Sequence, residues 1–123
     1  MRGKSLRKRG VAVVIRHDHV LLVKDRGKNR YSLPGGGVHP GERSYKAAAR
    51  ELFEETGLKA TNTAYIGSFD GALSLHKAFL VEAGGHVHLQ NGGELESYLW
   101  WNMKSHVPVY PHVKSILVML KKM

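Results

Sequence analysis

The residues best suited to chemistry are three glutamates within residues 50–58. Glu51, Glu54 and Glu55 stand at positions i, i+3 and i+4, which places their side chains on one face of a helix. Three like charges on one face repel one another, and a bound cation would neutralise them. Carboxylate oxygens are the ligands that Mg²⁺ and Mn²⁺ prefer, so the cluster predicts a site for one of these ions. Taken alone, a solvated acidic helix face is the commoner explanation.

A glycine-rich segment precedes this helix, with four glycines among the seven residues 35–41. Glycine lets backbone N–H groups approach a phosphate closely, so the segment is expected to form a phosphate-binding loop. Cations in the polar segment before it could hold distal phosphates, although each also fits a solvated surface position. The candidate substrate-binding residues are Gly35, Gly36, Gly37, Arg26 and Arg30.

The spacing of these residues resembles the Nudix box. That pattern is Gly, five residues, Glu, seven residues, and then Arg-Glu-apolar-any-Glu-Glu-any-Gly-apolar. Every specified position is filled, at Gly36, Glu42, Arg50, Glu51, Leu52, Glu54, Glu55, Gly57 and Leu58. Seven fixed identities, each at a frequency of about 6%, match by chance at roughly one position in 10⁹. The resemblance implies an α/β fold, a Nudix-like α/β/α sandwich with a mixed central sheet.

The resemblance also implies an activity, that of a hydrolase acting on phosphorus-containing anhydrides. Such an enzyme is a metal-dependent pyrophosphohydrolase in which water attacks one phosphorus of a nucleoside diphosphate derivative. Glu51, Glu54 and Glu55 match catalytic, metal-binding glutamates, and Arg50 matches an arginine that orients one of them. Glu42 matches a junction glutamate that is more often structural but can reach a metal. The implied cofactor is Mg²⁺ or Mn²⁺, and the implied partner is a small-molecule nucleotide diphosphate.

The box does not fix the general base. Glu51 is one candidate, but members of the family often carry the base on a loop outside the box. Glu94 and Glu96 lie just before Trp100, where such a glutamate tends to occur. We take Glu94 as the candidate catalytic residue, and a solvated loop acid explains either residue equally well.

Hydrophobic patterning predicts the elements that position these residues. Strands are expected at residues 11–15, 20–23, 63–69, 74–82 and 98–102. A central helix is expected at Ser44–Thr56, ending in a left-handed cap at Gly57. Its buried stripe is expected to be Ala49, Leu52, Phe53 and Thr56. A last helix opens at Tyr110-Pro111, with an apolar stripe of Val113, Ile116, Leu117 and Leu120.

Length and charge bound the domain layout and the partners. The chain of 123 residues is long enough for one compact domain, expected at residues 10–123 after a basic segment at residues 1–9. The net charge of +9 favours polyanions, although a basic surface that only maintains solubility explains it as well. The charge keeps open a larger polyanion as substrate, such as an RNA 5′ end or a polyphosphorylated metabolite. A non-catalytic nucleotide sensor is a third reading, which the complete glutamate set disfavours.

Several weaker sequence features bear on the location of the protein and on other kinds of site. The absence of cysteine excludes a thiolate metal site. The sequence also has no signal-peptide core and no apolar run long enough to span a bilayer. Together these features predict a cytoplasmic protein without a membrane partner. Two histidine pairs share strand faces but lack a third ligand, so zinc is not favoured. The tryptophans are expected to pack mainly in the core, with at most one facing the site. The oligomeric state stays open.

Overall fold

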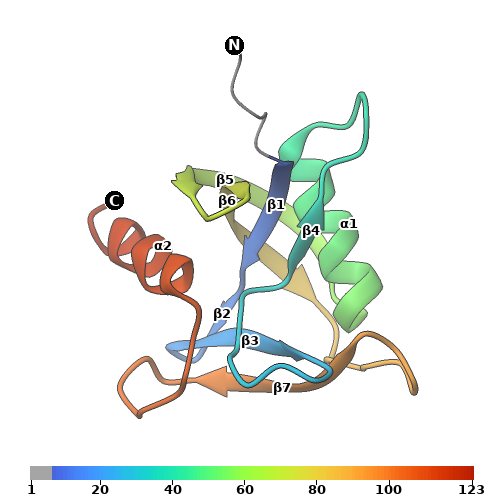
Figure 1. Ribbon diagram of the computed structural model, residues 1–123, viewed down its shortest axis with the longest axis vertical. Coiled ribbons are helices and arrows are strands. Elements are labelled where there is room, and N and C mark those ends of the chain that lie inside the picture. The colour runs from blue at the N-terminus through green and yellow to red at the C-terminus, as the bar shows by residue number, and fades with distance from the viewer. Residues whose placement is uncertain (1–6) are drawn as a thin grey trace.

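The computed structural model describes residues 7–123, which form a mixed α/β fold of two helices packed on two sheets (Figure 1). The helices are α1 (Ser44–Thr56) and α2 (Pro111–Lys121). The first sheet has the strand order β4 (Gly35–Gly37), β1 (Arg7–Val13), β6 (Ser74–Gly84) and β5 (Lys59–Asp70). The second sheet has the order β2 (Ile15–Arg16), β3 (His19–Asp25) and β7 (Leu95–Trp101). Strand β1 is parallel to β6 and antiparallel to β4, so the expected mixed sheet is confirmed.

The four-stranded sheet lies between the two helices, which confirms the expected α/β/α sandwich. Val11 and Val13 of β1 pack in one core cluster with Ile116 of α2. Ala12 and the following Val14 pack in the other cluster, which includes Leu52 of α1. Because both faces of β1 are buried over residues 10–13, that part of the strand is a continuous run without charged or polar side chains, whereas the three cations before it are not buried.

Helix α1 has the predicted bounds, but its buried face is rotated. The buried side chains are Ala47, Ala48, Leu52 and Thr56. The expected stripe was therefore wrong at Ala49, which is only partly buried, and at Phe53, which is 49% exposed. The reason is a close approach to β1: a Cβ on Gly10 would lie 2.6 Å from the Ser44 carbonyl oxygen and 2.7 Å from the Ala48 nitrogen. Only a small helix face fits against that glycine.

The end of α1 follows the prediction. Gly57 adopts φ 80°, in the left-handed region, and its N–H donates to the Phe53 carbonyl at 2.8 Å. Gly57 is therefore a left-handed cap that stops the helix just after its glutamates.

The glycine run was expected to be a loop, and that expectation was wrong. Gly35–Gly37 is strand β4, in which Gly35 pairs with Val11 and Gly36 pairs with Gly10. A Cβ on Gly35 would lie 2.5 Å from the Gly10 carbonyl oxygen, so the two strands approach this closely only because glycine is present.

Two other boundaries differ from the expectations. The predicted strand at residues 11–15 divides into β1 and β2, because the chain passes from one sheet to the other at the buried Val14. Strand β1 begins at Arg7, so the last three residues of the expected basic segment pair within the sheet, and residues 1–6 of that segment lie outside the described residues. Within residues 7–123, no helix is long and apolar enough to cross a bilayer.

Strand β7 separates the two tryptophans as expected. Trp101 is buried in the core cluster beside α2. Trp100 packs against the cluster beneath α1, with the Arg16 guanidinium 5.4 Å from its ring centroid. Both rings are thus accounted for by packing, and neither lines the cavity formed by the glutamates.

Candidate active site

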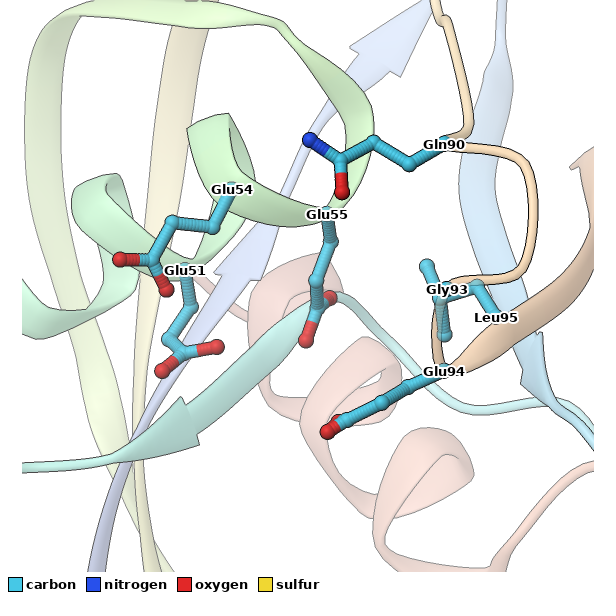
Figure 2. Close-up of a pocket in the computed structure, with 7 residues that line it drawn as sticks. All are labelled: Glu51, Glu54, Glu55, Gln90, Gly93, Glu94 and Leu95. Atoms are coloured by element: carbon cyan, nitrogen blue, oxygen red, sulfur yellow. The ribbon is translucent and has the colours of Figure 1, made fainter.

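The predicted glutamates line one cavity of about 350 Å³ (Figure 2). Glu51, Glu54 and Glu55 reach it from α1, and Glu94 reaches it from the segment just before β7. The fold thus brings together carboxylates about forty positions apart in the chain, as the sequence predicted. Gln90 also lines the cavity, which the sequence did not indicate because an amide in a polar loop carries no pattern.

Glu96, the alternative to Glu94, lies elsewhere. Its Oε2 accepts a hydrogen bond from Lys24 Nζ at 2.7 Å, and the Glu96 side chain is 44% exposed. The lysine lowers the pKa of Glu96, and a bond from the Gly27 N–H adds to the effect. Of the two candidate bases, only Glu94 lines the cavity.

Glu55 is the most deeply placed carboxylate of the set. Its pKa is raised from 4.5 to about 8, chiefly by burial and also by the nearby charge of Glu51, while a bond from the Gly35 N–H at 3.3 Å opposes the change. A buried carboxylate with so little compensation favours either a proton or a cation. The floor of the cavity is therefore suited to a positively charged ligand.

Arg50 organises the carboxylates through all five of its N–H donors. Nε and Nη2 donate to the two Glu42 oxygens at 2.8 and 3.0 Å, and Nη2 also donates to the Gly37 carbonyl at 2.9 Å. Nη1 donates to Glu51 Oε2 at 2.8 Å and to Glu54 Oε1 at 3.3 Å. The planar fork thereby ties Glu42, in the β4–α1 connection, to Glu51 on α1.

Glu42 is fully engaged by this network. Arg50 lowers its pKa to about 2, and the His39 N–H, which donates to Glu42 Oε1 at 2.9 Å, adds to that effect. Glu42 does not line the cavity of the other glutamates. Its observed contacts are those of a structural residue at the start of α1.

The three glycines of β4 have separate local roles. A Cβ on Gly36 would collide with the Glu51 carboxyl group, so this glycine makes the space that the carboxylate occupies. Gly35 donates to Glu55, and the carbonyl of Gly37 accepts from Arg50. The run therefore shapes the glutamate cluster from the sheet side.

Neither of the two arginines named as phosphate contacts lines the glutamate cavity. Arg26 Nε donates to the Gly93 carbonyl at 3.2 Å, and its backbone N–H donates to the Glu94 carbonyl at 2.8 Å. Arg26 thus fastens the segment that carries Glu94. The Arg30 guanidinium lies 4.3 Å from the centroid of the Tyr110 ring, beside a second cavity.

That second cavity, of about 240 Å³, is lined by residues of the sheet and of α2. His76 and His112 line it and stack with ring centroids 4.1 Å apart. Burial lowers the pKa of both, to about 4 for His112, so both are neutral near pH 7. Val11, also in its lining, pairs with Gly35, whose N–H donates to Glu55, which places this cavity beside the glutamates. No local pattern predicts this pair, because its members are 36 residues apart in the chain.

Comparison with known protein families identifies the family of this protein. A family model of the NUDIX domain matches residues 6–121, nearly the whole chain. The protein belongs to the Nudix family. Its glutamate cavity is therefore built from the segment that resembles the Nudix box, as the spacing from Gly36 to Leu58 predicted.

Individual Nudix relatives agree with this assignment. The NAD-capped RNA hydrolase NudC of Actinobacillus succinogenes is 31% identical over 116 residues, which cover 92% of this chain and 44% of that protein. Diphosphoinositol polyphosphate phosphohydrolase 2 of Rattus norvegicus is 35% identical over 81 residues, 63% of this chain and 45% of that protein. The chain spans less than half the length of these curated relatives. A MutT NUDIX hydrolase structure from Burkholderia pseudomallei, 20% identical, covers 95% of this chain and 99% of its own with a TM-score of 0.86, and shows the fold.

The residues of this Nudix site fit a hard divalent cation by type and by placement. Four carboxylates and no sulfur line one cavity, three of them on α1, and Gly36 leaves room for the carboxyl of Glu51. Within residues 7–123, no three acidic or imidazole groups converge on a single point, because Glu51 and Glu54 turn to Arg50. The Glu54 side chain is 56% exposed, and its contact with Arg50 is longer than that of Glu51, at 3.3 against 2.8 Å. Glu54 is therefore free to rotate toward the other two glutamates.

Proposed function

We propose that this protein is a metal-dependent pyrophosphohydrolase that cleaves a diphosphate linkage in a nucleotide derivative. The observation that carries the proposal is the single cavity lined by Glu51, Glu54, Glu55 and Glu94. Four carboxylates around about 350 Å³ have no purpose in packing, and they match the needs of a metal-bound phosphate and an attacking water. A cytoplasmic location, where nucleotides are plentiful, is part of the proposal.

Each residue has a proposed part in the reaction. Glu51, Glu54 and Glu55 would hold Mg²⁺ or Mn²⁺, which when bound supplies polarisation of the phosphate oxygens and a more acidic water. Arg50 orients Glu51 through its 2.8 Å bond. Glu94 would accept the proton of the attacking water from the opposite side of the cavity. Glu42 holds Arg50 in place, and its assignment as a further metal ligand stays a proposal that its bonds to Arg50 do not favour.

The second cavity would take the part of the substrate beyond the phosphates. Its neutral histidines offer a flat, weakly polar surface, and the Nδ1 atom of His76 is buried without a hydrogen-bond partner among the described residues. A planar group with an N–H donor suits that atom. Arg26, Arg30 and the Gly35–Gly37 backbone stay our candidates for contacts with the phosphates between the two cavities.

A panel of nucleoside diphosphate derivatives, assayed for released phosphate or nucleotide, tests the proposal. We expect turnover with Mg²⁺ or Mn²⁺ and none with excess EDTA, because water attack needs the cation. In ¹⁸O-labelled water the label should enter a phosphate product. Label on a carbon of the product, or turnover in chelated samples, would contradict the mechanism, and tight binding without turnover would favour a nucleotide sensor.

Glu54→Gln gives a matched mutational test of the metal site. The change keeps the size of the side chain but removes the charge, so the rate should fall at least about a hundredfold, the scale of losing a key electrostatic group. Glu82→Gln is the control, because Glu82 lies exposed on β6 and bonds only Asn62 through its side chain. A Glu54→Gln enzyme as active as the control would remove Glu54 from the site.

A further inference from the structure

A second surface, away from the glutamate cavity, combines aromatic rings with cations. Tyr45 at the start of α1 and Tyr65 on β5 are 40% and 51% exposed. Their ring centroids lie 6.5 and 5.5 Å from that of Phe79 on β6, so the three rings form one cluster. We call Tyr45, Tyr65, Phe79 and the adjoining cations Lys8 and Arg43 the aromatic face.

This face is the part of the four-stranded sheet that α1 leaves uncovered. Helix α1 starts at Ser44 and lies directly on β1 at Gly10. Phe79 extends from the next strand, and Tyr65 pairs opposite Phe79 in the register of β5 and β6. Tyr65 therefore stands beside the helix rather than beneath it, next to Tyr45 on the first turn of α1. Phe79 itself is only 7% exposed, so the surface presents two rings, and grouped exposed rings indicate a binding surface more often than isolated ones do.

A shallow hollow of about 720 Å³ runs along this face. Lys8, Arg43 and His39 line it together with Tyr45 and Phe79. Within the part of the chain that the structure describes, neither Lys8 nor Arg43 forms an ion pair. The one carboxylate in the lining, Glu42, has both oxygens held by Arg50. The hollow consequently presents uncompensated positive charge beside aromatic rings.

We propose that the aromatic face binds single-stranded RNA, with bases stacked on Tyr45 and Tyr65 and phosphates beside Lys8 and Arg43. Exposed rings that alternate with cations are the combination by which proteins hold single strands, since every base has a face that can stack. Ser44 and Tyr45, which line the hollow, offer hydroxyl groups to the 2′-hydroxyls of RNA, whereas the Tyr65 hydroxyl is already bonded to Ser68. A second copy of this chain is a poorer occupant, because a twofold contact would oppose the same cations. None of these residues lines the glutamate cavity, so the inference does not rest on the proposed function.

The test is the fluorescence anisotropy of a fluorescein-labelled ten-residue oligouridylate titrated with the full chain. Tyr65→Ala should weaken binding at least about fivefold, the low end for the loss of one stacked base. Tyr65→Phe should bind within twofold of the unaltered protein, because it keeps the ring and loses only the bond from the hydroxyl to Ser68. This pair separates stacking from any general damage to the strand.

Charge is tested by Lys8→Gln against Lys121→Gln. Lys8→Gln should reduce the slope of log Kd against log salt by about 0.7, the contribution of one phosphate contact to a single strand. Lys121, exposed at the end of α2, gives the same change in net charge away from the aromatic face. Equal effects of the two variants would overturn the proposal, since only the net charge would then matter.

Three further results would overturn it. The first is oligothymidylate binding as tightly as oligouridylate. The second is Tyr65→Phe losing as much affinity as Tyr65→Ala. The third is Tyr65→Ala converting a dimer to a monomer in sedimentation while RNA affinity is unchanged, which would assign the face to a second copy. Hydrolysis of a small diphosphate, measured in parallel, should be the same in Tyr65→Ala and unaltered protein, so failure of the proposed function is scored separately.

Discussion

Replacing Glu55 by glutamine should make the metal-free protein more stable at alkaline pH. Folding raises the pKa of this carboxyl from 4.5 to about 8, chiefly through burial. A carboxyl whose pKa is higher in the folded state favours folding while it is protonated, so that contribution is complete below pH 4.5 and is lost as the pH rises to about 8. Glutamine fills the same space, carries no charge, and should show no such loss.

The size of the effect follows from the two pKa values. Between the two pKa values, each pH unit changes the free energy of unfolding by about 1.4 kcal/mol. From pH 5 to pH 8 the unfolding free energy therefore changes by at most about 4 kcal/mol. Partial access of water reduces this, and we expect about 2 to 4 kcal/mol. His76 and His112, whose pKa values are lowered, change the stability of the protein below about pH 6.5. Their effect cancels when Glu55→Gln is compared with the unaltered protein at each pH.

The assay is urea unfolding with EDTA present, followed by tryptophan fluorescence at half-unit steps from pH 5 to pH 8.5. The difference in unfolding free energy between Glu55→Gln and the unaltered protein should increase steadily with pH. In 10 mM Mg²⁺ the unaltered protein should recover stability and the variant should recover less, because a ligand that binds only the folded state stabilises it. A difference that is constant with pH would refute the reasoning that Glu55 is a buried, uncompensated carboxylate.

The remaining predictions concern the two sides of the cavity. Gly36→Ala should lower kcat about a hundredfold while the fold persists, because the added methyl group displaces the Glu51 carboxyl. Gly37→Ala, where a methyl group would meet nothing within 4 Å, should leave kcat nearly unchanged, and a similar loss in both variants would argue against a positional effect. Glu94→Gln should reduce kcat between about a hundredfold and ten thousandfold, the range for a lost general base. Glu96→Gln should keep most of its activity because it breaks only an exposed ion pair, and the reverse ranking in steady-state kinetics would reassign the base.

Local patterns predicted much of what surrounds the glutamates. Helix α1 has the predicted bounds because its signals are local: strong helix formers inside and a glycine with positive φ at its end. The shared face of Glu51, Glu54 and Glu55 follows from helical periodicity alone. The placement of Glu94 in the same cavity relied on the resemblance to a family, since no local rule joins a loop to a helix about forty positions away.

The features that were missed depend on contacts distant in sequence. Phe53 fits the helical spacing, yet it is exposed. The reason is that Gly10 on β1 packs closely against α1, and only the face with small side chains fits there. The glycine run became strand β4 because glycines on both partners permit a close strand pair. The stacking of His76 on His112 likewise joins a strand to a helix, and nothing in either neighbourhood marks it. Such pairings are set by tertiary packing.

The contact of Arg26 with the backbone of residues 93–95 has a consequence for sequence change. The guanidinium binds the carbonyl oxygens of Gly93 and Leu95, and the Arg26 N–H binds that of Glu94. Every amino acid supplies a carbonyl, so this attachment places few demands on side-chain identity in the segment before β7. Residues 89–91 are therefore a place where altered sequences could be introduced while Glu94 keeps its position. Libraries aimed at new substrates could vary them, whereas Arg26, Gly92 with its φ of 74°, and Gly93 should be held constant.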